Sequence, residues 1–283
     1  MNTSLKRVCK QHPCPICEGI KWCSQSADGS IVICMRNQVG AIKETRNGGY
    51  LHRLKDVPYN GARVLHITPR TPPSPRFERM AVECFDALTH EGRAGLASSL
   101  GLSTESLVRL RTGWSAEHAS FSFPMHNSSG GIVGIRLRRP NGYKFSVTGS
   151  RSGIFLPVDT PWSGTLLITE GPTDCAAMLD LGFACIGRPD ALSCIGIVSE
   201  LVRQRGYHDV VVVGDGDAPG QRGAESLAST LRTVSKNVRI IYPPPGIKDA
   251  REWKRQGATR AEIEDAINHA PYLPMTVKAV LCA

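Results

Sequence analysis

A series of short apolar runs after residue 161 constrains the fold of this chain most strongly. These runs show no regular alternation of apolar and polar residues, which indicates strands that are buried on both faces. The strands are predicted at 166–169, 184–186, 210–213 and 238–242, with helices between them at 172–181, 191–205 and 219–231. Helical crossovers between buried strands predict a parallel α/β sheet, whose ligands bind at the carboxyl ends of the strands.

Acidic residues directly follow two of these predicted strands. Glu170 ends the first strand, and Asp215 and Asp217 follow the third. Residues two apart in an extended chain point the same way, so Asp215 and Asp217 can share one cation, with Glu170 approaching from a neighbouring strand. Oxygen ligands of this kind suit Mg²⁺ or Mn²⁺. Asp249 follows the last strand and can supply another acidic ligand.

The N-terminal region is dense in cysteine, with five of the ten cysteines of the chain between Cys9 and Cys34. In a cytosolic chain of this size, such clustering indicates metal binding rather than disulfides. We expect one structural Zn²⁺ in a closed four-thiolate site, because a module this small has too little core to fold alone. The expected ligands are Cys14, Cys17, Cys23 and Cys34. Cys9 or His12 remains an alternative to Cys23.

Composition along the chain divides it into units. We expect a zinc-ribbon module at 1–57 and a proline-rich linker at 58–76. A helical lead-in followed by an antiparallel β meander is expected at 77–160, the parallel α/β domain at 161–270 and a tail at 271–283. The linker assignment follows from successive prolines, which stiffen a chain and offer no backbone donors.

The charge balance favours a polyanionic partner. The net charge is +9 and the pI is near 9.2, and no acidic residue occurs between residues 131 and 151. That stretch carries Arg136, Arg138, Arg139 and Lys144, which we expect to contact phosphate groups. The chain shows neither a signal segment nor a run of apolar residues long enough to cross a bilayer, so a cytoplasmic protein without membrane contact is expected.

The acidic residues stand in a recognisable order: strand-Glu-Gly, then strand-Asp-x-Asp about 40 residues later, then a Lys-Asp loop at Lys248-Asp249. This order resembles the Toprim domain, which bacterial-type and phage primases share with topoisomerases and some nucleases. The segment GDGDAPG at 214–220 fits the second Toprim motif closely.

The resemblance extends upstream of the predicted parallel sheet. The segments at 123–125, 130–135 and 144–155 are similar to the basic subdomain that precedes Toprim in primases, and 102–114 resembles its helical lead-in. Zinc ribbon, linker, basic subdomain and Toprim follow one another as in the primase half of phage primase-helicases.

The resemblance implies a DNA primase that joins ribonucleotides on a single-stranded DNA template by two-metal catalysis. Glu170, Asp215 and Asp217, with Asp249, would then form the catalytic metal site. The basic residues above, together with Lys248, would bind the template or the incoming ribonucleoside triphosphate. No nucleotide-binding P-loop motif occurs, so we expect a separate replicative helicase as partner. The alternatives are a Toprim metal-dependent nuclease and a non-catalytic zinc-containing DNA-binding protein.

Overall fold

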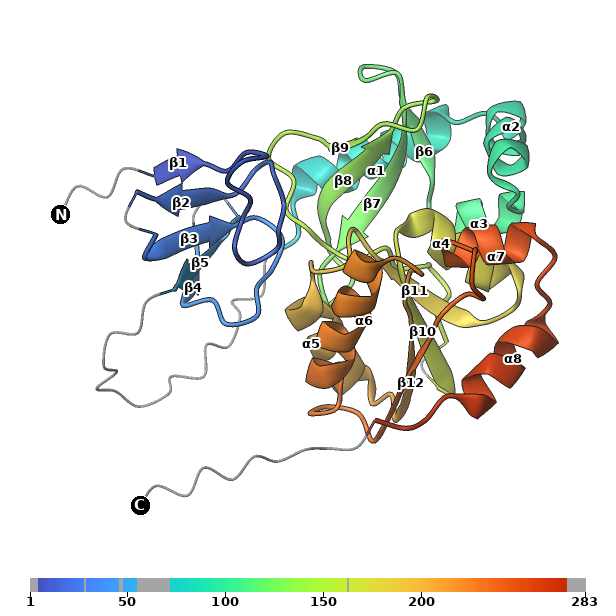
Figure 1. Ribbon diagram of the computed structural model, residues 1–283. Coiled ribbons are helices and arrows are strands. Elements are labelled where there is room, and N and C mark those ends of the chain that lie inside the picture. The colour runs from blue at the N-terminus through green and yellow to red at the C-terminus, as the bar shows by residue number, and fades with distance from the viewer. Residues whose placement is uncertain (1–4, 28, 46–47, 55–71, 162, 274–283) are drawn as a thin grey trace.

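The computed structural model describes residues 5–27, 29–45, 48–54, 72–161 and 163–273 (Figure 1). These residues form three sheets: a small N-terminal sheet, an antiparallel middle sheet and a parallel C-terminal sheet flanked by helices. The expected fold class is therefore confirmed. Most of the expected linker, at 58–71, and most of the expected tail, at 274–283, lie outside the described residues.

The N-terminal sheet is antiparallel and small, with the strand order β1-β2-β3-β5-β4. Its strands are β1 (Leu5–Arg7), β2 (Ser24–Ser26), β3 (Ile31–Cys34), β4 (Lys43–Glu44) and β5 (Tyr50–Arg53). Among the described residues, its buried apolar cluster consists of Val8, Val32 and three cysteines. A cluster this small cannot offset the entropy of folding, so the sheet depends on its cysteines.

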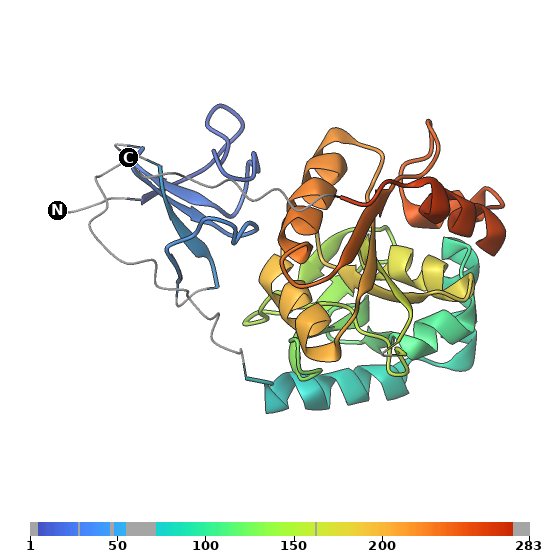
Figure 2. The same ribbon diagram turned by 90° about the horizontal axis from the view of Figure 1, so that it is seen from below.

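The middle region begins with three helices and continues as a four-stranded antiparallel sheet in sequential order. Its elements are α1 (Pro75–Ala87), α2 (His90–Leu100), α3 (Thr104–Arg109), β6 (Gly113–Ser115), β7 (Ser120–His126), β8 (Ile132–Arg138) and β9 (Lys144–Ser146). Helix α1 runs below the body in Figure 2 and packs Phe77 and Ala81 against Ile135 and Leu137. The helix begins at Pro75, inside the expected linker, because proline suits the first helical turn.

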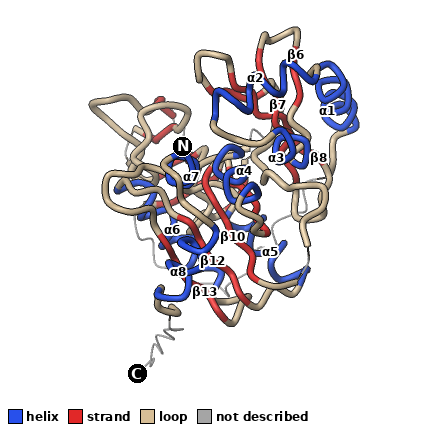
Figure 3. The backbone as a smooth tube through the Cα atoms, turned by 90° about the vertical axis from the view of Figure 1, so that its right-hand side faces the viewer, coloured by secondary structure: helices blue, strands red, loops and turns tan. Residues whose placement is uncertain are grey.

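The C-terminal domain is a four-stranded parallel sheet in the order β11-β10-β12-β13. Strands β10, β12 and β13 of this sheet are labelled in Figure 3. Its strands and crossover helices are β10 (Thr165–Glu170), α4 (Pro172–Asp180), β11 (Ala184–Arg188), α5 (Ile195–Arg205), β12 (Asp209–Val213), α6 (Ala218–Leu231) and β13 (Asn237–Ile241). Two further helices, α7 (Ala250–Arg255) and α8 (Arg260–His269), follow the last strand.

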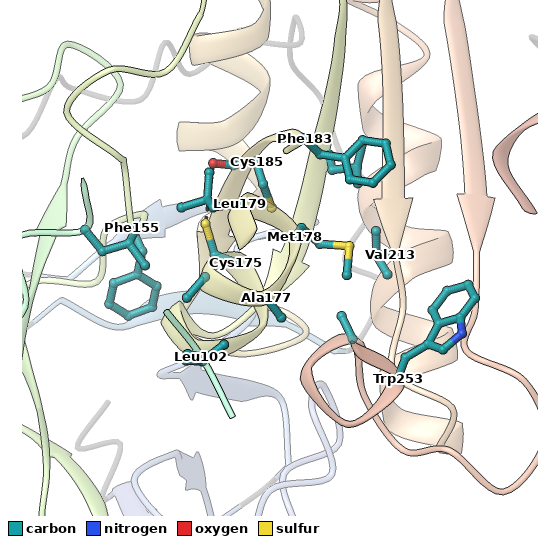
Figure 4. Close-up of a cluster of buried hydrophobic side chains, with 14 of the residues drawn as sticks. Leu102, Phe155, Cys175, Ala177, Met178, Leu179, Phe183, Cys185, Val213 and Trp253 are labelled. Atoms are coloured by element: carbon teal, nitrogen blue, oxygen red, sulfur yellow. Dashed lines mark hydrogen bonds between the residues drawn. The ribbon is translucent and has the colours of Figure 1, made fainter. Parts of the chain in front are cut away.

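Both faces of the parallel sheet are buried, as the unalternated strands predict. Leu166 and Ile168 pack under α5 and α6, whereas Leu167 packs on the opposite face. That opposite face is covered by α4, whose Cys175 lies toward Phe155 and whose Met178 lies toward Val213 in Figure 4. Buried cysteines in this layer act as small apolar residues.

Arg239 forms an ion pair within the sheet and a hydrogen bond that links the C-terminal helix to it. The Arg239 side chain on β13 is buried, and one of its terminal nitrogens lies 2.8 Å from both Asp209 carboxylate oxygens. A second terminal nitrogen donates to the Ile267 carbonyl of α8, and the Tyr272 ring lies 4.8 Å from the guanidinium. The expected strand at 238–242 therefore carries one buried charge, whose two terminal nitrogens are both hydrogen-bonded to neighbouring segments.

Candidate metal and nucleic-acid site

The strand order places the acidic residues at a reversal of the sheet. From β10 the chain moves to β11 on one side, and then returns to β12 on the other side. Helices α4 and α6 leave these strands on opposite faces, and in sheets of this kind ligands bind in the crevice at the carboxyl ends of such strands, here β10 and β12. Glu170 is the last residue of β10, and Gly171 adopts a φ of +86° that turns the chain into α4.

The second acidic segment forms a tight loop between β12 and α6. Asp215 is half-buried, and Asp217 is exposed and caps α6, where its carboxylate accepts from the Gly220 amide at 2.8 Å. The Gly216 amide donates to the Lys248 carbonyl at 2.7 Å, and a Cβ at Gly216 would lie 2.9 Å from the Ile247 carbonyl oxygen. Glycine at this position therefore lets the loop after β13 approach the loop after β12.

This approach brings Asp249 to the acidic loop. Asp249 caps α7, accepting from the Glu252 amide at 2.8 Å, and Lys248 beside it is exposed. A fifth carboxylate, which the sequence analysis missed, lies here as well. Asp174 in the first turn of α4 is 7% exposed and accepts from the Arg251 amide at 3.0 Å. An acidic residue directly before the apolar run at 175–179 was the signal available for it.

The electrostatics show that these carboxylates form one group. Burial raises the pKa of Asp215 to about 8, and the charges of Glu170, Asp174, Asp249 and Asp217 add to the shift. Burial also raises the pKa of Glu170, against the opposing effect of Arg188. The pKa of Asp174 is raised by burial and by Asp249. Carboxylates whose ionisation is disfavoured by one another are stabilised by a shared cation, so the donor set fits a divalent metal.

The buried Arg188 at the end of β11 was also missed. Its backbone is paired with Glu170, and its guanidinium donates to the Ala191 carbonyl at 2.7 Å. Burial lowers the pKa of Arg188, while Glu170 and Asp190 counter that shift. Arg188 is therefore a fixed positive charge beside Glu170, and only a strand pairing could reveal that it lies there.

Three of the four expected basic residues on the middle sheet share one face. In the β8–β9 register Arg138 pairs with Lys144 and Arg136 pairs with Ser146, so Arg136, Arg138 and Lys144 point to the same side. Partial desolvation lowers the pKa of Lys144, and Asp174 opposes this shift. The ammonium group thus lies within electrostatic reach of the acidic group. Arg139, by contrast, stacks over the rings of Tyr143 and Phe145 on the other side.

The N-terminal cysteines form the one set of His, Cys, Asp or Glu side chains that the described residues bring close enough to hold a metal ion. The ligand atoms of Cys14, Cys17, Cys23 and Cys34 all lie within 4.8 Å of one another. The Sγ atoms of Cys17 and Cys23 are 3.7 Å apart, close to the spacing in a tetrahedral site with Zn–S bonds of about 2.3 Å. The carboxylates of the C-terminal domain are grouped more loosely.

Backbone donors complete the cysteine site. The Met35 amide donates to Cys23 Sγ at 3.4 Å, and the Asn37 amide donates to Cys34 Sγ at 3.2 Å. The other three thiols hold the pKa of Cys14 below its usual range through hydrogen bonds. Four buried or half-buried sulfurs with such donors suit a closed zinc site. Cys9, an alternative ligand in the sequence analysis, lies outside this set and its thiol contacts Gln11.

Among the described residues, two ion pairs join the N-terminal cysteine-containing region to the rest of the molecule. Glu18 lies 2.9 Å from Arg222 on α6, and Glu44 lies 3.8 Å from Arg151. Arg222 stands in the second turn of the helix that Asp217 caps. The N-terminal sheet is therefore held beside the acidic crevice.

Comparison with solved structures identifies the class of fold. The zinc-binding and RNA polymerase domains of the Aquifex aeolicus primase match with a TM-score of 0.57 and 16% identity over 70% of this chain and 60% of that one. The DnaG primase catalytic domain bound to single-stranded DNA matches with a TM-score of 0.55 and 15% identity over 69% of this chain and 78% of that one. The chain thus has the fold of the DnaG primase catalytic core, with a Toprim-like parallel sheet and an N-terminal four-cysteine cluster.

Among curated proteins, the Gene 57 protein of Mycobacterium phage D29 is 33% identical over 119 residues, which are 41% of this chain and 74% of that protein. The chain belongs to the family of this phage protein. No family model matches the sequence. Within the described residues, no helix is both long and apolar enough to span a membrane.

Proposed function

We propose that the chain is a DNA primase, which synthesises short RNA primers on a single-stranded DNA template. The observation that carries this proposal is the pairing of an acidic crevice with a basic sheet face. Asp215 lies among four other carboxylates, and Lys144 and Arg138 stand across from them. A cleft with these two linings suits a substrate that brings phosphate groups and divalent cations together.

Glu170, Asp215 and Asp217 would hold Mg²⁺ or Mn²⁺, with Asp249 close by as a further acidic residue. A bound divalent metal supplies Lewis acidity, which lowers the pKa of an attacking 3′-hydroxyl and neutralises a leaving pyrophosphate. The charge of Arg188 attracts the Glu170 carboxylate at the end of β10, and the Arg251 amide donates a hydrogen bond to the Asp174 carboxylate. These contacts preorganise the acidic group before substrate binds.

Arg136, Arg138 and Lys144 would bind the template backbone or the triphosphate of the incoming ribonucleotide. Arginine suits this role because its planar guanidinium contacts two phosphate oxygens at once. Exposed Lys248 can bind a phosphate from the opposite side of the crevice. The single-stranded DNA in the similar DnaG structure supports a nucleic-acid template, and the four-cysteine cluster supports a structural zinc.

The test is extension from labelled ribonucleotides on mixed single-stranded DNA templates with magnesium or manganese. Wild-type chain should give template-directed products, and Asp215→Asn or Glu170→Gln should abolish them without loss of fold or DNA binding. The isosteric amides remove negative charge from the proposed metal site, and they leave the packing of the core nearly unchanged. Asp265→Asn, at an exposed aspartate on α8, is the matched control and should stay active.

A cleavage assay on the same templates separates the alternatives. Template cleavage without synthesis would move the chain to the Toprim nucleases, which use the same metals to activate water. If the chain binds DNA but catalyses neither synthesis nor cleavage, even with a replicative helicase present, it would be a non-catalytic zinc-containing DNA-binding protein.

A further inference from the structure

The tip of the β8–β9 hairpin carries a stack of rings that the proposed catalytic cleft does not use. The Tyr143 and Phe145 rings lie 5.8 Å apart between centroids, with their planes at 28°. The Phe145 ring is 6.2 Å from the His118 imidazole, which comes from the neighbouring β6–β7 turn. Phe145 is half-buried against α1, whereas Tyr143 is 60% exposed. The stack is thus anchored at one end and open to solvent at the other.

Arg139 completes this ring stack. Its guanidinium carbon lies 5.9 Å from the Tyr143 centroid and 5.5 Å from the Phe145 centroid. None of the ion pairs among the described residues includes Arg139. A guanidinium held over aromatic rings keeps its N–H groups available to a phosphate. An exposed ring therefore stands beside a positive charge that no carboxylate neutralises.

The ring stack lies on the face of the hairpin opposite to the catalytic cleft. Strand register sends Arg138 and Lys144 toward the acidic group, and Phe145 pairs with Leu137 on the α1 side. Tyr143 and Arg139 belong to that second side because they stack on Phe145. Contacts made there are separate from contacts to a nucleotide in the cleft.

We propose that Tyr143 and Arg139 form a second contact for single-stranded nucleic acid, outside the catalytic cleft. A base stacks on the open face of the Tyr143 ring, and Arg139 donates to an adjacent phosphate. This inference rests on the proposed function only in taking nucleic acid as the partner. Stacking tolerates any sequence because every base has a π face, which suits a strand that moves past the hairpin.

The charge of this region favours nucleic acid over a protein partner. No acidic residue occurs from residue 131 to residue 151, so the hairpin itself carries only positive charge. The nearest turn contributes Glu117, which lies 3.9 Å from the His118 imidazole and, among the described residues, pairs with none of the hairpin's arginines. Tyrosine and arginine also occur often in protein interfaces, but charged residues as a class are depleted at the centre of such interfaces. An exposed ring with a cation beside it suits the stacked bases and the phosphates of a single-stranded nucleic acid.

The first measurement is the affinity of the full chain for a fluorescent oligothymidylate by anisotropy. Tyr143→Ala should raise the Kd about 5- to 100-fold, because base–aromatic stacking is lost. Tyr143→Phe keeps the ring and should bind as the wild type does. Arg139→Gln should also weaken binding and lower the slope of log K against log salt by about 0.7, for one lost phosphate contact. Tyr272→Ala removes a tyrosine of similar exposure, 56%, and should leave the affinity unchanged.

The second measurement is photocrosslinking to an oligonucleotide that contains 5-bromouracil. The adduct should map to Tyr143 in the wild type and equally in Asp215→Asn, whose cleft is impaired. A wild-type chain that makes no primer but still forms this adduct would remove the primase proposal and keep the second contact. Wild-type affinity in Tyr143→Ala, with no adduct at Tyr143, would overturn the inference and leave the ring stack as a surface for a protein.

Discussion

Asp215→Asn should stabilise the chain when no divalent metal is bound in the acidic crevice. Burial and four neighbouring carboxylates raise the pKa of Asp215 from 3.8 to about 8. Near neutral pH the folded chain therefore keeps a proton on Asp215 that the unfolded chain releases. Between pH 3.8 and pH 7 this difference lowers the free energy of unfolding by at most about 4 kcal/mol. Relaxation and solvation of the carboxylates make this loss smaller, so we expect the free energy of unfolding of Asp215→Asn to exceed that of the wild type by about 1–3 kcal/mol.

The sign of the pH dependence follows from the raised pKa. The favourable contribution of Asp215 is complete below the unfolded-state pKa and is lost as the pH rises through about 8. The variant has no such group, so its advantage should be absent near pH 4 and should grow until about pH 8. Denaturant unfolding of the C-terminal domain in magnesium-free buffer, repeated across this range, measures it. Asp217→Asn is the comparison and should give a smaller gain, because Asp217 is exposed, its charge adds least to the Asp215 shift, and asparagine preserves the cap of α6.

The same experiment has a second arm with magnesium. Ligand binding to the folded state stabilises it, so magnesium should raise the stability of the wild type more than that of Asp215→Asn. A variant that is no more stable than the wild type without metal, or a difference that does not change with pH, would refute the reasoning from repulsion among the carboxylates.

Three further outcomes are expected. Elemental analysis should find one zinc per chain. Cys14→Ser should unfold the N-terminal sheet while the C-terminal domain stays folded, because zinc binding supplies about 10–16 kcal/mol of folding free energy to small modules of this kind. A metal-free chain with this sheet intact would contradict the prediction. Neutralising Arg136 and Arg138 together should weaken binding of single-stranded DNA and lower the slope of log K against log salt concentration by about 0.7 for each lost contact. An unchanged slope would mean that this face of the sheet is exposed to solvent and does not bind DNA. Glu18→Arg should replace the ion pair with Arg222 by repulsion and increase the radius of gyration in small-angle X-ray scattering at low salt, whereas Glu18→Gln should have a smaller effect.

The parallel domain could be predicted from the sequence because its strands have an unusual composition. Val210 to Val213 must be buried on both faces, and only a sheet covered by helices on both sides provides that. The positions of Glu170 and Asp215 at the strand ends follow directly. The structure brings these residues into one electrostatic group, although their roles in catalysis stay predictions.

Other parts of the candidate site could not be read from the sequence because they depend on contacts between distant segments. Asp174 and Arg188 reach the site through strand order and through the docking of α7 against α4, neither of which leaves a local pattern. Arg139 follows Arg138 directly, and one residue of register sends it to the other face of the hairpin. A basic run in a strand thus predicts charge, but only the pairing assigns each charge to a surface.

The buried ion pair of Arg239 has a consequence for how the chain avoids association with other copies. Strand β13 is the edge of the parallel sheet, and an open edge is a template for pairing with another chain. Here the edge strand carries a charged side chain held inward, and the Leu273 amide donates to the Val238 carbonyl on that same edge. Tyr272 over the guanidinium holds this cover in place. The residues that follow α8 therefore cover part of an edge that would otherwise be open to pairing with another copy of the chain.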